Sequence, residues 1–498
     1  MIIFPLLLAN TALFHSLDPR SVIQQLAYYE LYPHTAEGKQ AWRQAWELLS
    51  EGCNGEICSV PPAEGLPLVD ARAIISLVTS RSAQNSTILT PNQLSLLQEL
   101  GKQLTNRKLQ GANVWTKQEV LALPPEQIDV ARGLLIEQFD TDPAAKDKIL
   151  QYEAMLDLMA LEIRASLPPH ATPIQKIDLI NHFIFEEMHF RFPPHSLYAK
   201  DIDLYTFLPA VLDSREGVCL GVSILYLCLA QRLDLPLEVI TPPGHIYLRY
   251  NDNGKHINIE TTARGIDPPS ETYLGMNNRI LQERTYKEVI GLAFINQAST
   301  FWEAGKYGEN VSLYEKALPY LPEDNLLKLF LGLSYLFIGE KGKARRFLEE
   351  LRDYTFPYAV SRETIAEDYL RGRVDIEGLK NIFLHVDETR ESVLNKQALL
   401  QKTLKTYPRF RAGLLQLATT WLQLGRTSEA LDVLTGYHRI DPTDATIQYY
   451  LSIVFMERLD YPSAWTHFKN AENLLLARSH HPKALEQLRL QLLHFSPP

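Results

Sequence analysis

At 498 residues the chain is too long for a single core, because one hydrophobic core stops growing at about 250–300 residues. Hydrophobic residues make up 46% of the chain and charged residues 22%, the balance of a folded protein rather than of a disordered one. The formal net charge of −10 argues against the broad basic face that binds phosphate backbones, so no nucleic acid partner is expected.

The N-terminus begins with an apolar stretch, residues 1–14. The stretch has the length of a signal-peptide core, but no Lys or Arg precedes it and no small-x-small cleavage site follows it. We therefore expect a buried first helix or strand in a cytoplasmic protein, with an exported protein as the alternative. No uninterrupted apolar run reaches the roughly 20 residues that span a bilayer, so no integral membrane segment is expected.

Four cysteines in a chain of this length do not make the disulfide framework of a small secreted protein. Cys53 and Cys58 are the only close pair, and they would form a small disulfide if the protein were exported. A metal site would need two further ligands that the surrounding sequence lacks. We expect two free thiols near a loop, and neither a metal ion nor another cofactor.

Residues 1–142 predict a helical N-terminal region. Apolar residues recur at three- and four-residue spacing behind an Asp, Thr or Pro, or after a Gly, as amphipathic helices require. This pattern occupies the stretches 18–32, 38–49, 90–104 and 124–139. Pro-rich and Asp-rich loops at 59–67 and 140–147 separate the helices, and no catalytic motif is apparent.

The pattern changes over residues 143–290. Long helices are predicted over 144–167, 174–190 and 218–235, where apolar residues recur at helical spacing. Two runs rich in β-branched and aromatic residues, HIYLRY and HINIET, then flank NDNGK. An Asn-Gly between such runs favours a tight hairpin, because both central residues of the turn need a positive φ. Helices followed by an antiparallel sheet predict an α+β domain.

The C-terminal residues, 291–498, contain an internal repeat on a 34-residue frame, which is the spacing of tetratricopeptide repeats. The four copies are Phe301, Gly305, Tyr314, Ala317 and Pro322; Tyr335, Gly339, Leu348 and Leu351; Trp421, Gly425, Ala430, Leu434 and Pro442; and Phe455, Ala464, Phe468 and Ala471. The first copy has Asn310 where a small residue is expected. Repeats are therefore predicted over 291–356 and, together with a C-terminal helix, over 413–498. Residues 357–412 predict irregular helices, or one degenerate repeat.

The hairpin makes a geometric prediction. If Asn253 and Gly254 are the central turn residues, positions whose numbers sum to 507 face each other. His245 then lies opposite Thr262, and Glu260 lies opposite Tyr247. His245 and Glu260 would share one face of the hairpin, with the apolar residues Ile246, Leu248, Ile257 and Ile259 on the other. A three-residue loop would place the imidazole and the carboxylate on opposite faces.

Cys219 has two interpretations on these residues alone. It opens an apolar helix, and a free cysteine is among the commonest buried residues. Gly217, however, indicates a tight entry that would place Cys219 at the helix N-terminus, where unpaired amides and the helix dipole favour a thiolate. Cys228, nine residues on, projects from the opposite side and is predicted to lie in the core.

Residues 207–250, together with HINIETTARG after them, resemble the transglutaminase-like superfamily, in the bacterial branch of SirB family proteins. That branch joins an RxG turn and an apolar helix to a PGH strand, followed by an acidic residue on the next strand. The resemblance covers about 143–290 and implies a papain-like core. It implies Cys219 as nucleophile, His245 as general base and Glu260 as the residue that orients the imidazole. Repeats after such a domain also resemble members of this branch.

The expected architecture is α+β: a papain/transglutaminase-like core, a helical N-terminal region and a C-terminal all-α tetratricopeptide-repeat solenoid. Two functions of different classes stay open. The first is a cysteine enzyme acting on amide bonds, whose repeats recruit a protein or peptide partner. The second is a non-catalytic adaptor in which the repeats provide the function. A third hypothesis is a regulatory protein that binds a small ligand in the former active-site cleft.

Overall fold

The computed structural model describes residues 11–51, 71–79, 89–193, 206–387 and 389–496. The predictions for Cys53, Cys58, the loop 59–67 and the first ten residues lie outside this part of the chain. The chain divides into two compact units. The first unit comprises the residues up to Val239, then 246–267 and 284–296, and the second comprises 240–245, 268–283 and 297–498.

The predicted N-terminal helices are present in the first unit. They are α2 (Val22–Leu31), α3 (Ala36–Ser50), α5 (Pro91–Gly101) and α7 (Val130–Phe139), joined by α4 (Ala71–Thr79) and α6 (Lys117–Ala122). Side-chain oxygens start several of them, because the first amides of a helix lack a backbone acceptor. Thr90 forms a capping box with Gln93, and Asp129 accepts from the amide of Arg132.

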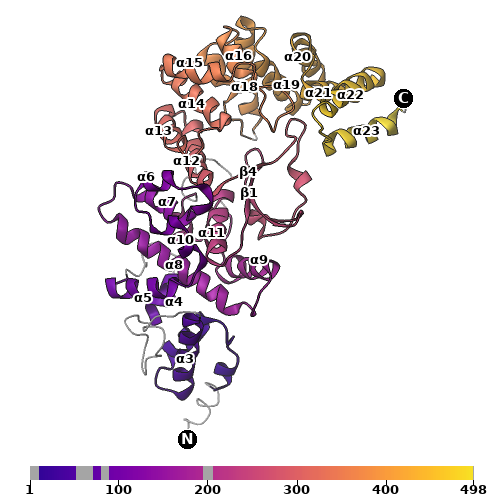
Figure 1. Ribbon diagram of the computed structural model, residues 1–498. Coiled ribbons are helices and arrows are strands. Elements are labelled where there is room, and N and C mark those ends of the chain that lie inside the picture. The colour runs from indigo at the N-terminus through magenta and orange to yellow at the C-terminus, as the bar shows by residue number, and fades with distance from the viewer. Residues whose placement is uncertain (1–10, 52–70, 80–88, 194–205, 388, 497–498) are drawn as a thin grey trace. The chain divides into compact units, whose positions relative to one another are not determined.

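The central element of the first unit is α11 (Cys219–Arg232). Nearly all of its side chains are buried, as the apolar sequence predicted. It packs against α7, α8 (Ala145–Ser166), α9 (Pro173–Asn181) and α10 (Leu208–Ser214), and Figure 1 shows it among α7, α8 and α10. The helix predicted over 174–190 is interrupted, because α9 passes into the π-helix η5 at His182–Glu187.

A four-stranded sheet has the order β3-β2-β1-β4. Its strands are β1 (Glu238–Thr241), β2 (Tyr247–Asp252), β3 (Lys255–Ile259) and β4 (Gln282–Arg284). The predicted register is confirmed along β2 and β3, from Leu248 opposite Ile259 to Asp252 opposite Lys255. Asn253 and Gly254 have φ values of 50° and 91°, as a two-residue hairpin turn requires. β1 and β4 were not predicted.

The β2–β3 ladder does not extend to His245 and Glu260. The prediction that these residues continue the paired strands, opposite Thr262 and Tyr247, was wrong. Glu260 does not continue β3 as a strand residue. It forms a bridge with Ile266, whose carbonyl accepts from the Glu260 amide at 3.0 Å. The carboxylate of Glu260 accepts from the amide of Thr262, which lies in the 3₁₀ helix η7 (Thr261–Ala263). Thr262 is therefore helical and is not the strand partner of His245, which precedes β2.

The repeat sequences form antiparallel helix pairs. The pairs are α12 (Tyr286–Glu303) with α13 (Tyr307–Ala317), α14 (Asn325–Phe337) with α15 (Lys341–Glu350), α19 (Arg411–Gln423) with α20 (Thr427–Ile440), and α21 (Ala445–Glu457) with α22 (Tyr461–Leu476), followed by α23 (Lys483–Phe495). The turn residues Gly305, Gly339 and Gly425 have positive φ, as does Leu459 in the last pair. Among the described residues, no helix is long and apolar enough to cross a membrane.

Asn310 departs from the repeat frame without leaving a buried polar group unsatisfied. Its side chain is fully buried. Its Nδ2 donates to the carbonyl of Ala298 at 2.7 Å, and its Oδ1 accepts from the Ser334 hydroxyl at 2.6 Å. Both amide groups therefore have partners, which offsets the cost of burying an Asn in a position that other copies give to Ala.

The segment 357–412 forms two short helices and a longer one. They are α16 (Ile365–Leu370), which packs against α15, and α17 (Ile376–Ile382) and α18 (Arg390–Thr406), which pack against each other. Gly372 has a φ of 67° and lies 33 residues after Gly339. Arg411 at the start of α19 binds Glu367 at 2.6 Å and Asp368 at 2.8 Å on α16, all three side chains being buried. A charged contact thus replaces part of the apolar packing between regular repeats.

Candidate functional site

The turn before Cys219 is held by Arg215, the first residue of the RxG motif. Arg215 has a φ of 57° and is 7% exposed. Its guanidinium donates to the carbonyl of Met188 at 2.9 Å. The backbone around it pairs with Arg191, whose amide donates to the Arg215 carbonyl and whose carbonyl accepts from Gly217. The segment after η5 therefore fixes the direction from which the chain enters α11.

Gly217 allows the tight entry that the sequence predicted. A Cβ atom at this position would lie 2.6 Å from the Cγ2 atom of Val222, too close without movement of the helix. Cys219 is then the first residue of α11, and Val218 at the cap position carries no oxygen that could accept from the first amides. These amides and the positive end of the helix dipole lie beside the Cys219 thiol, an arrangement that favours a developing negative charge.

The two cysteines of α11 differ in burial. Cys219 is half-buried, whereas Cys228 is completely buried, as predicted for a core residue. Burial raises the pKa of the Cys228 thiol far above its ordinary range, and the nearby charge of Arg232 does not offset this. Of these two thiols, only Cys219 is placed where a substrate could reach it.

Two hydroxyl groups connect the start of α11 to the segment that carries Glu260. The Thr261 hydroxyl donates to the Cys219 carbonyl at 3.4 Å, and it shares a 3.0 Å hydrogen bond with the Ser223 hydroxyl. Thr261 and Ser223 are both buried. Glu260 is 5% exposed, and its Oε1 accepts from the Thr262 amide at 3.1 Å and from the Thr262 hydroxyl at 2.6 Å. The first unit thus brings Cys219 and Glu260 onto connected elements.

Sequence reasoning missed the hydroxyl pair, although one signal was present. Ser223 is the one serine of α11, a helix without a threonine, and its side chain is fully buried. A buried hydroxyl needs a partner, so a Ser in such an apolar run indicates a polar contact from another element.

His245 is delivered by the Pro-Pro-Gly turn and belongs to the second unit. Its amide donates to the carbonyl of Pro242 at 3.1 Å, and Gly244 has a φ of 72°. Pro followed by Gly at positive φ is the pattern of a type II turn. The imidazole stacks on the ring of Tyr273, with centroids 5.6 Å apart and planes 21° apart. The sequence did not predict Tyr273, and the pairing of His245 with Cys219 remains a prediction.

The other end of α11 lies in a cluster of buried charges. Arg232 donates to Asp157 of α8 at 2.8 Å, and Arg132 of α7 makes two 2.6 Å bonds to Glu153 of α8. Burial alone would raise the pKa of Asp129, but Arg232 and a hydrogen bond from Asn106 hold it below its usual value. The carboxylates are therefore matched by arginines and have a structural role. Among the described residues, no group of three His, Cys, Asp or Glu side chains could hold a metal ion.

The second unit contains a cavity of about 500 Å³ among its helices. Aromatic and aliphatic side chains line it, including Phe356, Tyr358, Phe383 and Leu415, together with the polar side chains of Arg362 and Gln416. An apolar cavity with a few polar groups is a general feature of ligand-binding sites.

Comparison with known proteins identifies one domain. Residues 150–284 match the sequence model of the transglutaminase-like superfamily, within the region that resembled it by motif. F-box only protein 21 of Mus musculus is 33% identical over 76 residues, which is 15% of this chain and 12% of that protein. The Homo sapiens protein of the same name is 32% identical over 76 residues. The chain thus spans about 12% of the length of these curated relatives.

Solved structures resemble part of the chain at low identity. A crystal structure of MamA is 14% identical with a TM-score of 0.21, and it covers 36% of this chain and 96% of its own. A thermophilic TPR protein of Thermus thermophilus is 17% identical with a TM-score of 0.21 and covers 41% of this chain and 98% of its own.

Proposed function

We propose that this chain is a cysteine enzyme of transglutaminase-like type that acts on amide bonds, with helical repeats that recruit a protein partner or substrate. The observation that carries the proposal is the position of Cys219. It is the half-buried first residue of a helix whose first amides have no side-chain cap, within the residues that match the superfamily. The finer placement in the bacterial SirB branch, which rests on the RxG and PGH motifs, is part of this proposal.

In the proposed reaction, the Cys219 thiolate attacks the amide carbonyl carbon and forms a tetrahedral intermediate. The amides at the start of α11 hold the oxyanion. The C–N bond then breaks, His245 protonates the leaving amine, and a thioester to Cys219 remains. Water or a second amine attacks the thioester and releases the thiol, so the outcome is hydrolysis or acyl transfer. Glu260 orients the imidazole, as the third member of such triads does.

The repeats supply the partner in this proposal. Stacked helix pairs present an extended surface to peptides and proteins. The cavity beside Phe383 and Leu415 gives that surface an apolar site with polar groups at its wall. Recruitment through the repeats would tether a protein substrate to the chain that carries the thiol.

Thiol reactivity tests the nucleophile. With iodoacetamide at neutral pH, we expect Cys219 to react more than about 100-fold faster than Cys228, because alkylation of the buried thiol requires local unfolding. The pH midpoint for Cys219 should lie below about 8.5 and rise in His245→Gln. Both cysteines lie between Arg215 and Arg232 on one tryptic peptide, so fragment ions must separate the two modifications.

His256→Gln is the matched control, because His256 lies on the same hairpin but on the exposed part of β3. Its midpoint should equal that of the wild type. A Cys219 thiol that stays inert in the folded protein, or a midpoint that does not depend on His245, would remove the nucleophile assignment.

The adaptor remains the second candidate, and one observation favours it. The Oε1 atom of Glu260 accepts hydrogen bonds from the amide and the hydroxyl of Thr262, so the side chain caps η7, which is a structural role. A Glu260→Gln variant separates the two functions, because the Gln carbonyl can still accept from Thr262. A scaffold predicts unchanged alkylation of Cys219 in this variant, whereas the enzyme predicts a higher pH midpoint.

A further inference from the structure

The second part of the loop between β3 and β4 belongs to the same compact unit as the repeats. Residues 268–283 follow the candidate hairpin in the chain, yet they group with 297–498 and with 240–245, the turn that carries His245. This second part contains the 3₁₀ helix η8 (Ser270–Tyr273). We name residues 270–279 the strap.

The strap pairs with a loop of the repeats. The amide of Arg279 donates to the Tyr358 carbonyl at 2.8 Å, and the amide of Val360 donates to the Asn277 carbonyl at 3.2 Å. The side chain of Asn277 adds two bonds, because its Oδ1 accepts from the amides of Val360 at 3.1 Å and Ser361 at 2.6 Å. These bonds form a short antiparallel bridge between two segments about 80 residues apart in the chain.

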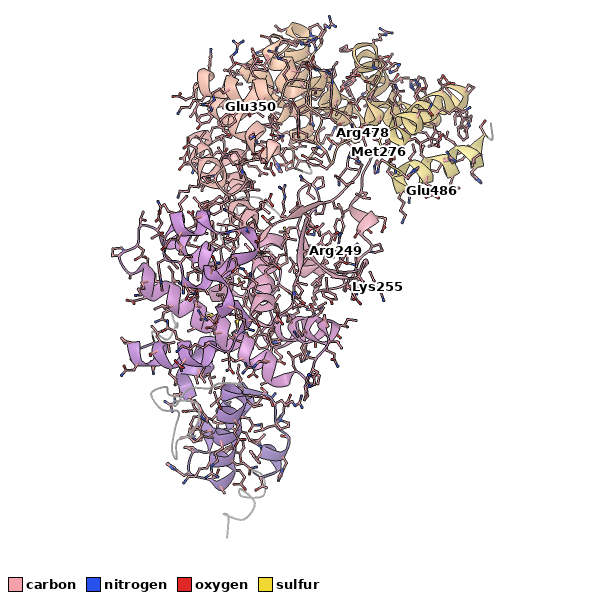
Figure 2. All side chains as sticks on the ribbon, viewed as in Figure 1. Arg249, Lys255, Met276, Glu350, Arg478 and Glu486 are labelled. Atoms are coloured by element: carbon pink, nitrogen blue, oxygen red, sulfur yellow. The ribbon has the colours of Figure 1, made fainter. Side chains whose placement is uncertain are left out.

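The C-terminal helices hold the same junction from the other side. His480, which is 3% exposed, donates from Nε2 to the Gly275 carbonyl at 2.8 Å. Met276 packs against the apolar cluster of α21, α22 and α23. Arg478 donates to the Ala359 carbonyl at 3.0 Å, and Figure 2 labels it beside Met276. The strap is therefore fastened to two separate parts of the repeat region.

The other end of the strap touches the candidate general base. Tyr273 stacks on the imidazole of His245, with centroids 5.6 Å apart. Its backbone carbonyl accepts from the Asn278 side chain at 3.2 Å, and Asn278 is 8% exposed and forms the bridge with Ala359. A continuous set of contacts thus runs from His480 and the repeat loop to the His245 ring.

We infer that Tyr273 is a positioning residue for His245 and that the repeats set its placement through the strap. An aromatic face stacked on an imidazole restricts the ring and favours its protonated form, the form that protonates a leaving amine. A partner that loosens the contact between the strap and the repeats would change the orientation of His245. The effect of the strap on catalysis rests on the proposed function, whereas the structural coupling between the repeats and the His245 ring does not.

Histidine NMR of the full chain tests the coupling without an activity assay. The ring protons of His245, assigned by comparison with His245→Gln, should carry a ring-current shift from Tyr273. The shift should disappear in Tyr273→Ala and persist in Tyr273→Phe, which keeps the ring. It should also be lost in His480→Ala, which releases the strap from the repeats, but not in His481→Ala, whose side chain is exposed.

Asn277→Ala is the second release variant, because Asn277 is exposed and its loss does not open the core. An unchanged His245 signal in both His480→Ala and Asn277→Ala would overturn the coupling. An unchanged signal in Tyr273→Ala would overturn the positioning role.

The pH profile of Cys219 alkylation gives the second readout. Loss of the aromatic face in Tyr273→Ala should raise the midpoint by about 0.5 pH unit, the value of an exposed cation–π contact, with Tyr273→Phe unchanged. If the NMR signal of His245 changes in the release variants while the pH profile of Cys219 alkylation does not depend on His245, the coupling through the strap is supported and the enzyme proposal fails. If alkylation of Cys219 depends on His245 but the NMR signal of His245 is unchanged in the release variants, the enzyme proposal stands and the coupling through the strap fails.

Discussion

The two ends of α11 are stabilised by opposite means. At the C-terminal end, Arg232 and Cys228 are fully buried, and the charge of Arg232 is matched by Asp157. At the N-terminal end, Cys219 is half-buried and its carbonyl accepts from the hydroxyl of Thr261. The charged end fixes the helix in the core, so the other end can keep its first amides without a side-chain cap. A reactive thiol at Cys219 is compatible with this fold, because the contacts that hold α11 in the core lie at the opposite end of the helix.

The largest effect is expected at the charged end. Arg232→Met removes one of the two arginines that bind Asp157 and leaves only Arg107, and removing a partner from a buried ion pair costs at most about 3–5 kcal/mol. Hydrogen exchange of the α11 amides measures this loss locally, which avoids assuming two-state unfolding of a chain with several domains. Arg191→Met is the control, because its ion pair with Glu216 is exposed and should contribute at most about 1 kcal/mol. A loss as small as the control's would show that the carboxylates do not depend on Arg232.

A second buried carboxylate of α8, which has no arginine partner among its hydrogen bonds, tests whether pairing with arginine is what keeps the pKa of such a group low. Glu162 is 4% exposed and accepts from the Ser21 hydroxyl at 2.8 Å. Burial raises its pKa to about 7. In the folded state Glu162 therefore holds its proton between about pH 4.5 and 7, where the unfolded chain has released it. Its contribution to stability is present below pH 4.5 and is lost as the pH rises through 7.

Glu162→Gln should therefore match the wild type at pH 5 and exceed its stability at pH 8. The difference should reach about 3 kcal/mol, since each pKa unit corresponds to about 1.4 kcal/mol. Hydrogen exchange of the α8 amides, corrected for the intrinsic exchange rate at each pH, measures it, with Glu47→Gln on the solvent side of α3 as the control. A difference that does not change with pH would contradict the raised pKa.

The smallest effect is expected at the thiol end. Thr261→Val keeps the shape but removes the hydroxyl that bonds Ser223 and the Cys219 carbonyl, and it should cost about 1–2 kcal/mol. Adding Ser223→Ala should recover part of that loss, because no buried hydroxyl then lacks its partner. Hydrogen exchange of α11 in the double-mutant cycle measures the coupling. Additive losses would show that the two hydroxyls act independently.

Several features follow from local sequence. Asn253 and Gly254 determined the register of β2 and β3, because only a two-residue turn with positive φ joins such strands so tightly. Gly217 indicated the tight entry to α11, since a Cβ atom there would lie too close to Val222. The 34-residue frame of bulky, small and turn residues predicted the helix pairs, and the turn residues have positive φ, as Gly305 and Gly339 show. Each of these constraints acts over a few residues.

Other features were decided only by tertiary contacts. Glu260 leaves the ladder because its carboxylate caps η7 instead, a competition that residue spacing does not reveal. Tyr273 meets His245, and His480 meets Gly275 more than 200 residues earlier in the chain. The match of Arg232 with Asp157 likewise joins two helices 75 residues apart. The sequence by itself determined the local turns, helix starts and repeat period, whereas packing between distant segments decided which polar groups became partners, because a buried group bonds whatever the fold brings within reach.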